Sequence, residues 1–417
     1  MSGQVINTGV AIIGAGHAGG AAAAALRQAG YAGPVLLAGE EPHPPYQRPP
    51  LSKAWLKGEI DHSGLALKHD DWYGANAVDL RLGVRALAID PAAKTVTLDD
   101  GATVVWEKLV IATGARPRLL PGMENRPANL ITLRNRADAD ALKAALAPGR
   151  RLVIIGAGYV GLEVAASATG ASAQVTVLER EPRVLARVAS PEMSAFFSRL
   201  HRGHGVDLRT GARIAGFDTE GGRITAVRLE GGETLPCDAV LAGVGAVPNA
   251  EIAEAAGLAC DNGVIVDGAA RTSHPDIFAI GDVTHRPLPL YGRTARLESV
   301  PSALEQAKQA ACAIAGKPQP PAETPWFWSD QYDVKLQIAG LPFDADRRVA
   351  RGDPDSGRFA VFHLAGGRLM AVEAANAPQE FMAAKMMIQN RRTVDPALLA
   401  DPGVSMKEIM ARQTAAA

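Results

Sequence analysis

Two glycine-rich turns of the same pattern, 142 residues apart, constrain this chain more than any other feature. The first is Gly14-Ala15-Gly16-His17-Ala18-Gly19 and the second is Gly156-Ala157-Gly158-Tyr159-Val160-Gly161. Each follows a short apolar run, at 10–13 and 152–155, and each opens a helix-like pattern. In dinucleotide-binding units, the three glycines permit a tight turn, close approach of the backbone to a pyrophosphate, and close helix–strand packing. The repeat predicts two Rossmann-like units that bind two dinucleotides, an arrangement typical of proteins that pass electrons between them.

Each unit also has an acidic residue at the expected distance. Glu40 follows an apolar run at 35–38 and lies 21 residues after Gly19, and Glu179 follows a run at 175–178 and lies 18 residues after Gly161. A spacing of about 20 residues is typical of the carboxylate that accepts hydrogen bonds from ribose hydroxyls. At Glu179 this favours NADH over NADPH, although the neighbouring Arg180 and Arg183 weaken the argument. At Glu40, a solvated acid at the end of a strand is the alternative.

The remaining pattern predicts three domains. Apolar runs at 109–113 and 240–245 end in small residues, which permit close approach of a ligand or mark ordinary turns. The run at 277–280 needs a sheet, and the first unit supplies one, so we expect a first dinucleotide-binding domain over 1–115 and 246–320 with a second inserted at 116–245. A Pro-rich stretch at 317–325 is typical of a linker. We expect a C-terminal α+β domain over 321–417, with a helix at 378–391.

Composition narrows the classes of function. The net charge of −1 gives no global attraction to nucleic acid or membrane. No run of 18 apolar residues is present, and the run at 10–13 is too short for a signal peptide, so we expect a cytoplasmic protein. Cys237, Cys260 and Cys312 lack the spacing of a redox pair, and we expect buried, inert thiols. The nine histidines show no metal-ligand spacing, and no metal site is predicted.

Several specific segments together identify a family resemblance. They are Pro45-Tyr46-Gln47-Arg48-Pro49-Pro50-Leu51-Ser52-Lys53, Ala112-Thr113-Gly114, the second glycine turn with Glu163, Ile280-Gly281-Asp282, and Trp326-Phe327-Trp328-Ser329-Asp330-Gln331-Tyr332. Over essentially its whole length the chain resembles the NADH-dependent ferredoxin reductases of bacterial oxygenase systems. Stretches at 200–211, 298–306 and 325–332 carry a closer likeness to the putidaredoxin-reductase branch.

The resemblance implies FAD, NADH and a small [2Fe–2S] ferredoxin that serves a haem-thiolate monooxygenase or a ring-hydroxylating dioxygenase. It leaves the oligomeric state open between a monomer and a weak dimer. The positions that it assigns to FAD are Gly14, Gly16, His17, Ala18, Gly19, Glu40, Arg48, Lys53, Val84, Ala112, Thr113, Gly114, Arg134, Gly281, Asp282, Glu298, Ser299, Val300 and Trp328. The positions assigned to NADH are Gly156, Gly158, Tyr159, Val160, Gly161, Glu163, Glu179, Arg180, Arg187, Val244 and Gly245.

Three residues stand out as candidate catalytic groups: Lys53, Glu163 and Trp328. Glu163 lies in a helix of otherwise small and apolar residues, where a carboxylate is costly unless it is paired. The resemblance places it near flavin N5 and the nicotinamide with Lys53 as its partner, whereas a Glu that reaches solvent is the alternative. Trp328 would cover an edge of the isoalloxazine, or else belong to the core of the third domain.

The segment at 298–301 has the residues of a helix start, with Ser299 before Pro301. The positive end of that helix would favour negative charge at flavin N1 and O2. Arg293, Arg296 and Lys335 are candidates for docking the ferredoxin.

Other functions stay open. Pyridine-nucleotide disulfide reductases and related peroxidases need a reactive cysteine near the flavin, and the absence of any Cys before Cys237 argues against them. A thiol-independent NADH oxidase is another possibility. So is an NADH-responsive binding module resembling apoptosis-inducing factor, although that family commonly has targeting segments and insertions that this sequence does not show.

Overall fold

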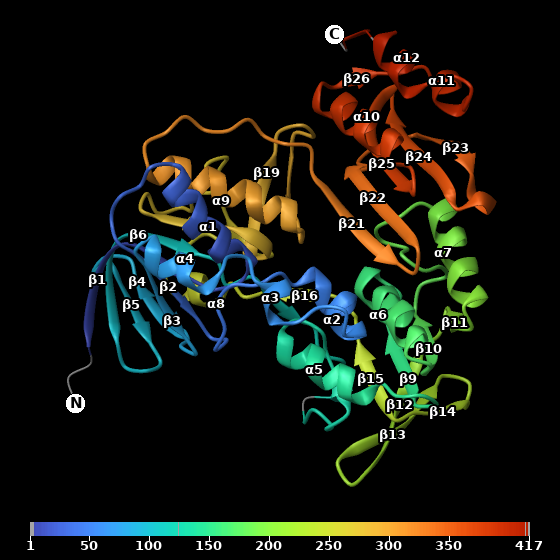
Figure 1. The fold of residues 1–417 in the computed structure, drawn as a ribbon, viewed down its shortest axis with the longest axis horizontal. Coiled ribbons are helices and arrows are strands. Elements are labelled where there is room, and N and C mark those ends of the chain that lie inside the picture. The colour runs from blue at the N-terminus through green and yellow to red at the C-terminus, as the bar shows by residue number, and fades with distance from the viewer. Residues whose placement is uncertain (1–3, 124, 413, 416–417) are drawn as a thin grey trace. The chain divides into compact units, whose positions relative to one another are not determined.

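The computed structural model describes residues 4–123, 125–412 and 414–415, and the chain divides into two compact units. Unit 1 contains the chain up to Gln47, His62–Arg116 and Val247–Glu323, and unit 2 contains Arg48–Asp61, Pro117–Ala246 and the chain from Thr324 onward. Figure 1 shows the elements of each unit. Short strands β7 (Ala115–Pro117) and β16 (Ala246–Pro248) pair where the chain passes from one unit to the other.

Unit 1 is built on a seven-stranded sheet in the order β3-β2-β1-β6-β5-β4, with β18 paired to β6. Strands β3, β2, β1, β6 and β18 are parallel, and β5 and β4 are antiparallel. The strands are β1 (Val5–Ile13), β2 (Val35–Gly39), β3 (Val78–Leu82), β4 (Ala86–Asp90), β5 (Thr95–Leu98), β6 (Thr103–Ile111) and β18 (Ile277–Ala279). A smaller sheet contains β17 (Val264–Ile265), β19 (Thr284–Leu288) and β20 (Arg293–Arg296).

Both faces of the parallel sheet are buried, which explains the uninterrupted apolar run at its centre. Val10 and Ile12 of β1 pack on one face with α1 (His17–Gln28) and α9 (Val300–Ile314), which lie side by side in Figure 1. Ala11 and Ile13 pack on the other face with α8 (Glu251–Ala255) and the antiparallel strands. The remaining helices of unit 1 are α3 (His62–Leu65), α4 (Asp70–Ala75) and the 3-10 turn η2 (Gly281–Val283).

Unit 2 contains a second parallel sheet in the order β11-β10-β9-β15-β8. Its strands are β8 (Leu130–Ile131), β9 (Arg151–Ile155), β10 (Gln174–Glu179), β11 (Asp207–Thr210) and β15 (Ala239–Ala242). An antiparallel sheet of β12 (Ile214–Glu220), β13 (Arg223–Leu229) and β14 (Thr234–Pro236) belongs to the same segment. The helices of this part of unit 2 are η1 (Pro49–Ser52), α2 (Ala54–Lys57), α5 (Arg136–Ala145), α6 (Tyr159–Gly170) and α7 (Pro191–Gly203).

The C-terminal part of unit 2 is a largely antiparallel sheet in the order β21-β22-β25-β24-β23, with β26 and β27 at its side. The strands are β21 (Trp326–Gln331), β22 (Val334–Gly340), β23 (Arg347–Asp353), β24 (Arg358–Ala365), β25 (Arg368–Ala375), β26 (Arg392–Thr393) and β27 (Thr414–Ala415). The helices are η3 (Pro354–Ser356), α10 (Pro378–Gln389), α11 (Pro396–Ala400) and α12 (Met406–Ala411).

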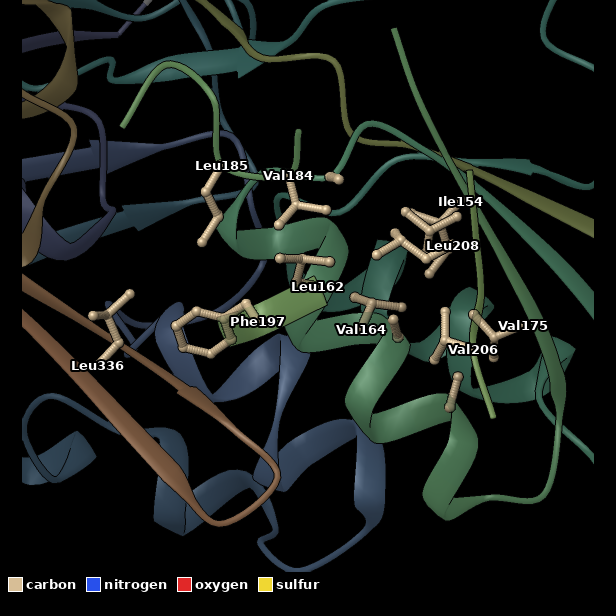
Figure 2. Packing of buried hydrophobic residues seen from close by; sticks show 14 of the residues in the cluster. Ile154, Leu162, Val164, Val175, Val184, Leu185, Phe197, Val206, Leu208 and Leu336 are labelled. Carbon is tan, nitrogen blue, oxygen red and sulfur yellow. The ribbon is translucent and has the colours of Figure 1, made fainter. Parts of the chain in front are cut away.

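One hydrophobic core joins the second parallel sheet to the C-terminal sheet. It includes Ile154 of β9, Leu162 of α6, Phe197 of α7 and Leu336 of β22, all at most 2 % exposed (Figure 2). Fully burying an aliphatic or aromatic side chain contributes about 1.5–3 kcal/mol. This shared burial explains why the two segments, far apart in sequence, form one compact unit.

The predicted fold class is confirmed: two Rossmann-like units and a C-terminal α+β segment are present. Between α9 and β21, the described residues 315–325 form no helix or strand, as expected for a Pro-rich linker. Several expected strands are longer in the structure, whereas the runs expected at 240–245 and 277–280 form the shorter strands β15 and β18. β1 begins at Val5 because its first half pairs with β6, and the expected helix at 378–391 ends two residues earlier, at Gln389.

Candidate functional site

The first glycine turn connects β1 to α1 in a shape that admits no side chain at two of its positions. Gly14 has φ +110°, and a Cβ there would lie 2.2 Å from the carbonyl oxygen of Ala112. A Cβ on Gly19 would lie 2.0 Å from the carbonyl oxygen of Gly14. The amide of Gly14 donates to the carbonyl of Ala38 on β2 at 2.8 Å. The turn is therefore locked between the ends of three parallel strands.

The carboxyl ends of these parallel strands gather most positions that the resemblance assigns to FAD. Glu40 follows β2, the segment Ala112-Thr113-Gly114 follows β6, and Gly281 and Asp282 follow β18. Val84 lies at the same edge, since its amide donates to the carbonyl of Gly39 at 3.0 Å. This edge is where open α/β sheets bind their ligands.

Glu40 itself is exposed, and among the described residues its carboxylate has no hydrogen bond or ion pair. It is thus available to an external donor such as a ribose hydroxyl. With Gly16 as the N-cap of α1 and no acidic residue in the first turn, the helix start also suits a pyrophosphate. The residues of unit 1 fit a dinucleotide on these observations.

The start of α9 was predicted correctly, and it is tied to the turn that carries Asp282. Ser299 accepts a hydrogen bond from the amide of Ser302 at 3.3 Å. Inside the helix, the buried Gln306 accepts from the amide of Gly281 at 2.9 Å and from Thr284 at 3.0 Å. Gln306 therefore ties α9 to residues on both sides of Asp282. Glu298 pairs with Arg296.

Sequence reasoning missed Asn249, which fixes the end of β6. Its side-chain amide donates to the carbonyl of Thr113 at 2.9 Å, and the Thr113 hydroxyl donates to the carbonyl of Asn249 at 2.8 Å. The two residues are 136 positions apart, and no local pattern marks such a pairing.

The second glycine turn repeats the geometry of the first. Gly156 has φ +104°, and Cβ atoms on Gly156 and Gly161 would lie 2.4 Å and 2.2 Å from the carbonyl oxygens of Gly243 and Gly156. By contrast, a Cβ on Gly158 would meet nothing within 4 Å. Val160 at the start of α6 is 45 % exposed. The turn therefore leaves space where a pyrophosphate would approach.

Glu179 makes bonds that Glu40 does not. One carboxylate oxygen accepts from the amide of Ala157 inside the turn at 2.7 Å, and the other accepts from the amide of Glu181 at 2.9 Å. Arg180 is exposed and lies 3.2 Å from Glu181. Glu179 thus holds the shape of the turn before any ligand is considered.

The loop between β10 and α7 brings the other positions assigned to NADH together. Arg183 donates to the carbonyls of Ala186 and Ala189 and so fixes the loop that presents Arg187. The Arg187 guanidinium lies 3.9 Å from the Cβ position of Gly245, which is in the segment with Val244 after β15. The hydroxyl of Tyr159 donates to Val188 at 3.2 Å, and burial raises its pKa well above 10.

The buried carboxylate of Glu163 is paired with Lys53, as predicted. The Lys53 Nζ lies 2.6 Å from Glu163 Oε2, the side chains being 15 % and 7 % exposed. Ser52 donates to the same oxygen at 2.5 Å, and Ser329 of β21 donates to Oε1 at 2.7 Å. The two serines were not assigned a role from the sequence, because their partner is more than 100 residues away.

Arg48 and Arg134 also lie together in unit 2. The Arg48 guanidinium donates to the carbonyl of Arg134 at 2.6 Å, and the amide of Arg134 donates to Asp138 at 2.9 Å. Trp328 is half-buried on β21, with its ring centroid 5.6 Å from that of Trp326. Two docking candidates already have partners: Arg296 pairs with Glu298, and Lys335 lies 3.7 Å from Asp330.

The thiols differ in burial from the expectation. Cys237 is buried, and burial raises the pKa of its thiol to about 11, so the reactive thiolate is disfavoured. Cys260 and Cys312 are only partly buried, which corrects the prediction of three buried thiols. Within the described part of the chain, neither a cluster of metal-ligating side chains nor a helix able to span a membrane is found.

Comparison with known proteins places these features in a family. The family described as pyridine nucleotide-disulphide oxidoreductase matches residues 8–307, and the one described as reductase C-terminal matches residues 326–410. The probable ferredoxin reductase CtmF of Castellaniella defragrans is 49 % identical over 96 % of this chain and 98 % of its own length. Putidaredoxin reductase CamA of Pseudomonas putida is 43 % identical over 97 % of each chain.

A solved structure agrees over the same length. The reductase in the crystal structure of the covalent putidaredoxin reductase–putidaredoxin complex has a TM-score of 0.95 and 43 % identity. The match covers 97 % of this chain and 99 % of that one.

Proposed function

We propose that this chain, which belongs to the pyridine nucleotide-disulphide oxidoreductase family and to its ferredoxin reductases, passes electrons from NADH through FAD to a [2Fe–2S] ferredoxin. The observation that carries the proposal is the full-length structural match to a reductase solved in complex with its partner putidaredoxin. The partner and the oxygenase that it serves, a haem-thiolate monooxygenase or a ring-hydroxylating dioxygenase, are assigned by that likeness. We also assign the protein to the cytoplasm.

We assign FAD to unit 1 and NADH to unit 2. Gly14, Gly16 and Gly19 would cradle the pyrophosphate of FAD, the exposed Glu40 would accept from its ribose, and Asp282 would contact its ribityl chain. The N-terminus of α9 would favour negative charge on the flavin ring. The proposed domains follow this division: FAD-binding over 1–115 and 246–320, NADH-binding over 116–245, and a C-terminal domain over 321–417.

When bound, FAD supplies the chemistry that converts a two-electron donor into one-electron transfers. The residues of the chain bind and orient. Gly158 leaves room for the nucleotide pyrophosphate, Glu179 disfavours a 2′-phosphate, and Arg187 attracts the negative charge of the nucleotide. Lys53 and Glu163 form a largely buried ion pair. We assign this pair to the nicotinamide and flavin, and Trp328 to an edge of the flavin.

The test is anaerobic turnover with NADH and with NADPH, using a panel of purified [2Fe–2S] ferredoxins. We expect NADH-dependent reduction of at least one ferredoxin and a higher kcat/KM for NADH. A Cys237→Ala, Cys260→Ser, Cys312→Ser variant should keep that activity, because no thiol takes part. Reduction of bound flavin by NADH without transfer to any ferredoxin would contradict the proposal and favour a thiol-independent NADH oxidase or a binding module.

A further inference from the structure

We propose that Ser329, Gln331 and His201 form a one-way chain of hydrogen bonds that holds the Glu163 carboxylate in orientation toward Lys53. This assignment rests on the proposed function only in giving Lys53 and Glu163 a place at the flavin. The chain itself is formed entirely within unit 2, from α6, α7 and β21.

The links are continuous from the carboxylate toward the surface. Ser329 Oγ donates to Glu163 Oε1 at 2.7 Å, and Gln331 Nε2 donates to Ser329 Oγ at 3.1 Å. His201 Nε2 lies 2.9 Å from Gln331 Oε1, and the Tyr332 hydroxyl lies 3.3 Å from His201 Nδ1. Ser329, Gln331 and His201 are fully buried. Tyr332 is half-buried and stacks on the exposed His204, with ring centroids 3.7 Å apart.

Which group donates and which accepts in each hydrogen bond of the chain is determined by the Glu163 carboxylate at its end. An ionised carboxylate only accepts, so the single hydroxyl proton of Ser329 must point to Glu163. The lone pairs of Ser329 then face Gln331, which must present its NH2 group and turn its carbonyl to His201. That carbonyl requires a proton on His201 Nε2, which leaves Nδ1 as an acceptor for Tyr332.

A neutral imidazole with its proton on Nε2 satisfies this order, and its Nδ1 then accepts from the Tyr332 hydroxyl. Burial lowers the pKa of His201 to about 4, so the ring is neutral at physiological pH. The three buried groups therefore have one consistent set of proton positions, all pointing toward Glu163.

The arrangement suits orientation and not proton transfer. A carboxamide does not readily take up and pass on a proton at neutral pH, so Gln331 interrupts any relay. Ser52 and Lys53 both bind Glu163 Oε2, whereas Ser329 binds Oε1. Loss of the Ser329 hydroxyl would release that second oxygen and let the carboxylate rotate.

Strand β21 explains how the chain is built. Side chains alternate along a strand, so Ser329 and Gln331 share one face while Trp328 lies on the other. Phe327 packs on the ring of Tyr159 on the first face, with centroids 4.6 Å apart. One short strand thus carries both the residues that orient Glu163 and the tryptophan assigned to the flavin.

Two measurements test the chain. The first is independent of activity: 15N shifts of the His201 ring, assigned with His201→Phe, should show a neutral ring protonated at Nε2. In Gln331→Met, which removes the acceptor, the Nε2–H form should lose its dominance. A wild-type ring protonated at Nδ1 would overturn the proposal, even if Gln331→Met did not fold.

The second measurement is stopped-flow reduction of bound flavin by NADH. We expect Ser329→Ala and Gln331→Met to slow it roughly tenfold, since misplaced groups at a reacting centre lose rate steeply. Thr324→Val is the matched control, because it removes a buried hydroxyl of unit 2 that bonds to Gln389 and not to this chain. If Ser329→Ala kept its flavin and reacted as fast as Thr324→Val, the positioning role would be wrong. If wild-type flavin were not reduced by NADH, the proposed function would fail, while the histidine measurement would still decide the chain.

Discussion

The two glycine turns have nearly the same backbone but differ in how their acidic residues are used. In both, the first glycine has φ above +100° and the third packs against the carbonyl of the first. Glu40 is exposed and has no partner among the described residues, whereas Glu179 binds two backbone amides at its own turn. We infer that the first turn depends on its ligand for completion and that the second is preorganised by the protein itself.

That difference matches what the two sites are proposed to do. In this proposal FAD would stay bound through turnover, so its hydroxyls would satisfy Glu40 permanently. NADH enters and leaves in every cycle, so a turn that keeps its shape when empty avoids an ordering cost at each binding event. The helices that follow also differ, since α1 presents small apolar residues and α6 carries the buried, paired Glu163.

The largest expected effect comes from breaking the first turn. Gly14→Ala would place a methyl group 2.2 Å from the Ala112 carbonyl, and the backbone must move. We expect purified Gly14→Ala to lack bound flavin, as measured by absorbance. Gly30→Ala is the control, since Gly30 also has a positive φ, +82°, but nothing lies within 4 Å. Its cost should stay near 1–2 kcal/mol with flavin retained. A Gly14→Ala variant with its full content of flavin would contradict the proposal that FAD binds at the first turn.

A second expected effect is a change in the free energy of unfolding with pH, caused by the buried His201 of unit 2. Because burial lowers the pKa of His201 from 6.5 to about 4, the unfolded chain binds a proton in this window that the folded chain does not. Stability should therefore be unaffected by this group above pH 6.5 and decrease by about 3 kcal/mol as pH falls to 4.

Urea unfolding of the whole chain, repeated between pH 7 and pH 4, measures how the free energy of unfolding depends on pH. His201→Gln should make the free energy of unfolding depend less on pH over this range. An unchanged slope in His201→Gln would show that this histidine does not remain neutral in the folded protein.

A smaller effect tests the contrast between the acids directly. Glu179→Ala leaves the amides of Ala157 and Glu181 without their acceptor, which should cost about 1–3 kcal/mol in protein stripped of flavin and nucleotide. Glu40→Ala should change the same stability by less than about 0.5 kcal/mol but weaken FAD binding. The measurements are chemical unfolding and FAD titration. Equal destabilisation by the two variants would remove the distinction between the turns.

Much of this arrangement could be predicted from local pattern. The glycine turns, the acids at their fixed spacing and the start of α9 each depend on residues close in sequence. The Lys53–Glu163 pair was predicted from a family resemblance, supported by the rule that a carboxylate in an apolar helix needs a partner.

The rest depends on contacts between distant residues. Ser329 reaches Glu163 across 166 positions, and Asn249 reaches Thr113 across 136, and neither leaves a periodic signal. The two hydrogen bonds of Glu179 could not be foreseen either, because spacing alone does not show whether a carboxylate faces the backbone or solvent. Partial burial of Cys260 and Cys312 was likewise decided by packing.

The most direct test of the assignment of FAD to the first turn and NADH to the second uses Gly156→Ala. This substitution would place a methyl group 2.4 Å from the Gly243 carbonyl. Gly205→Ala, with φ +82° and open surroundings in unit 2, is the control. We expect Gly156→Ala to keep its flavin and to be reduced by NADH at least about 100-fold more slowly than wild type. After anaerobic photoreduction it should still reduce ferredoxin at the wild-type rate. Loss of flavin, or reduction by NADH at the wild-type rate, would contradict the assignment of FAD to the first turn and NADH to the second.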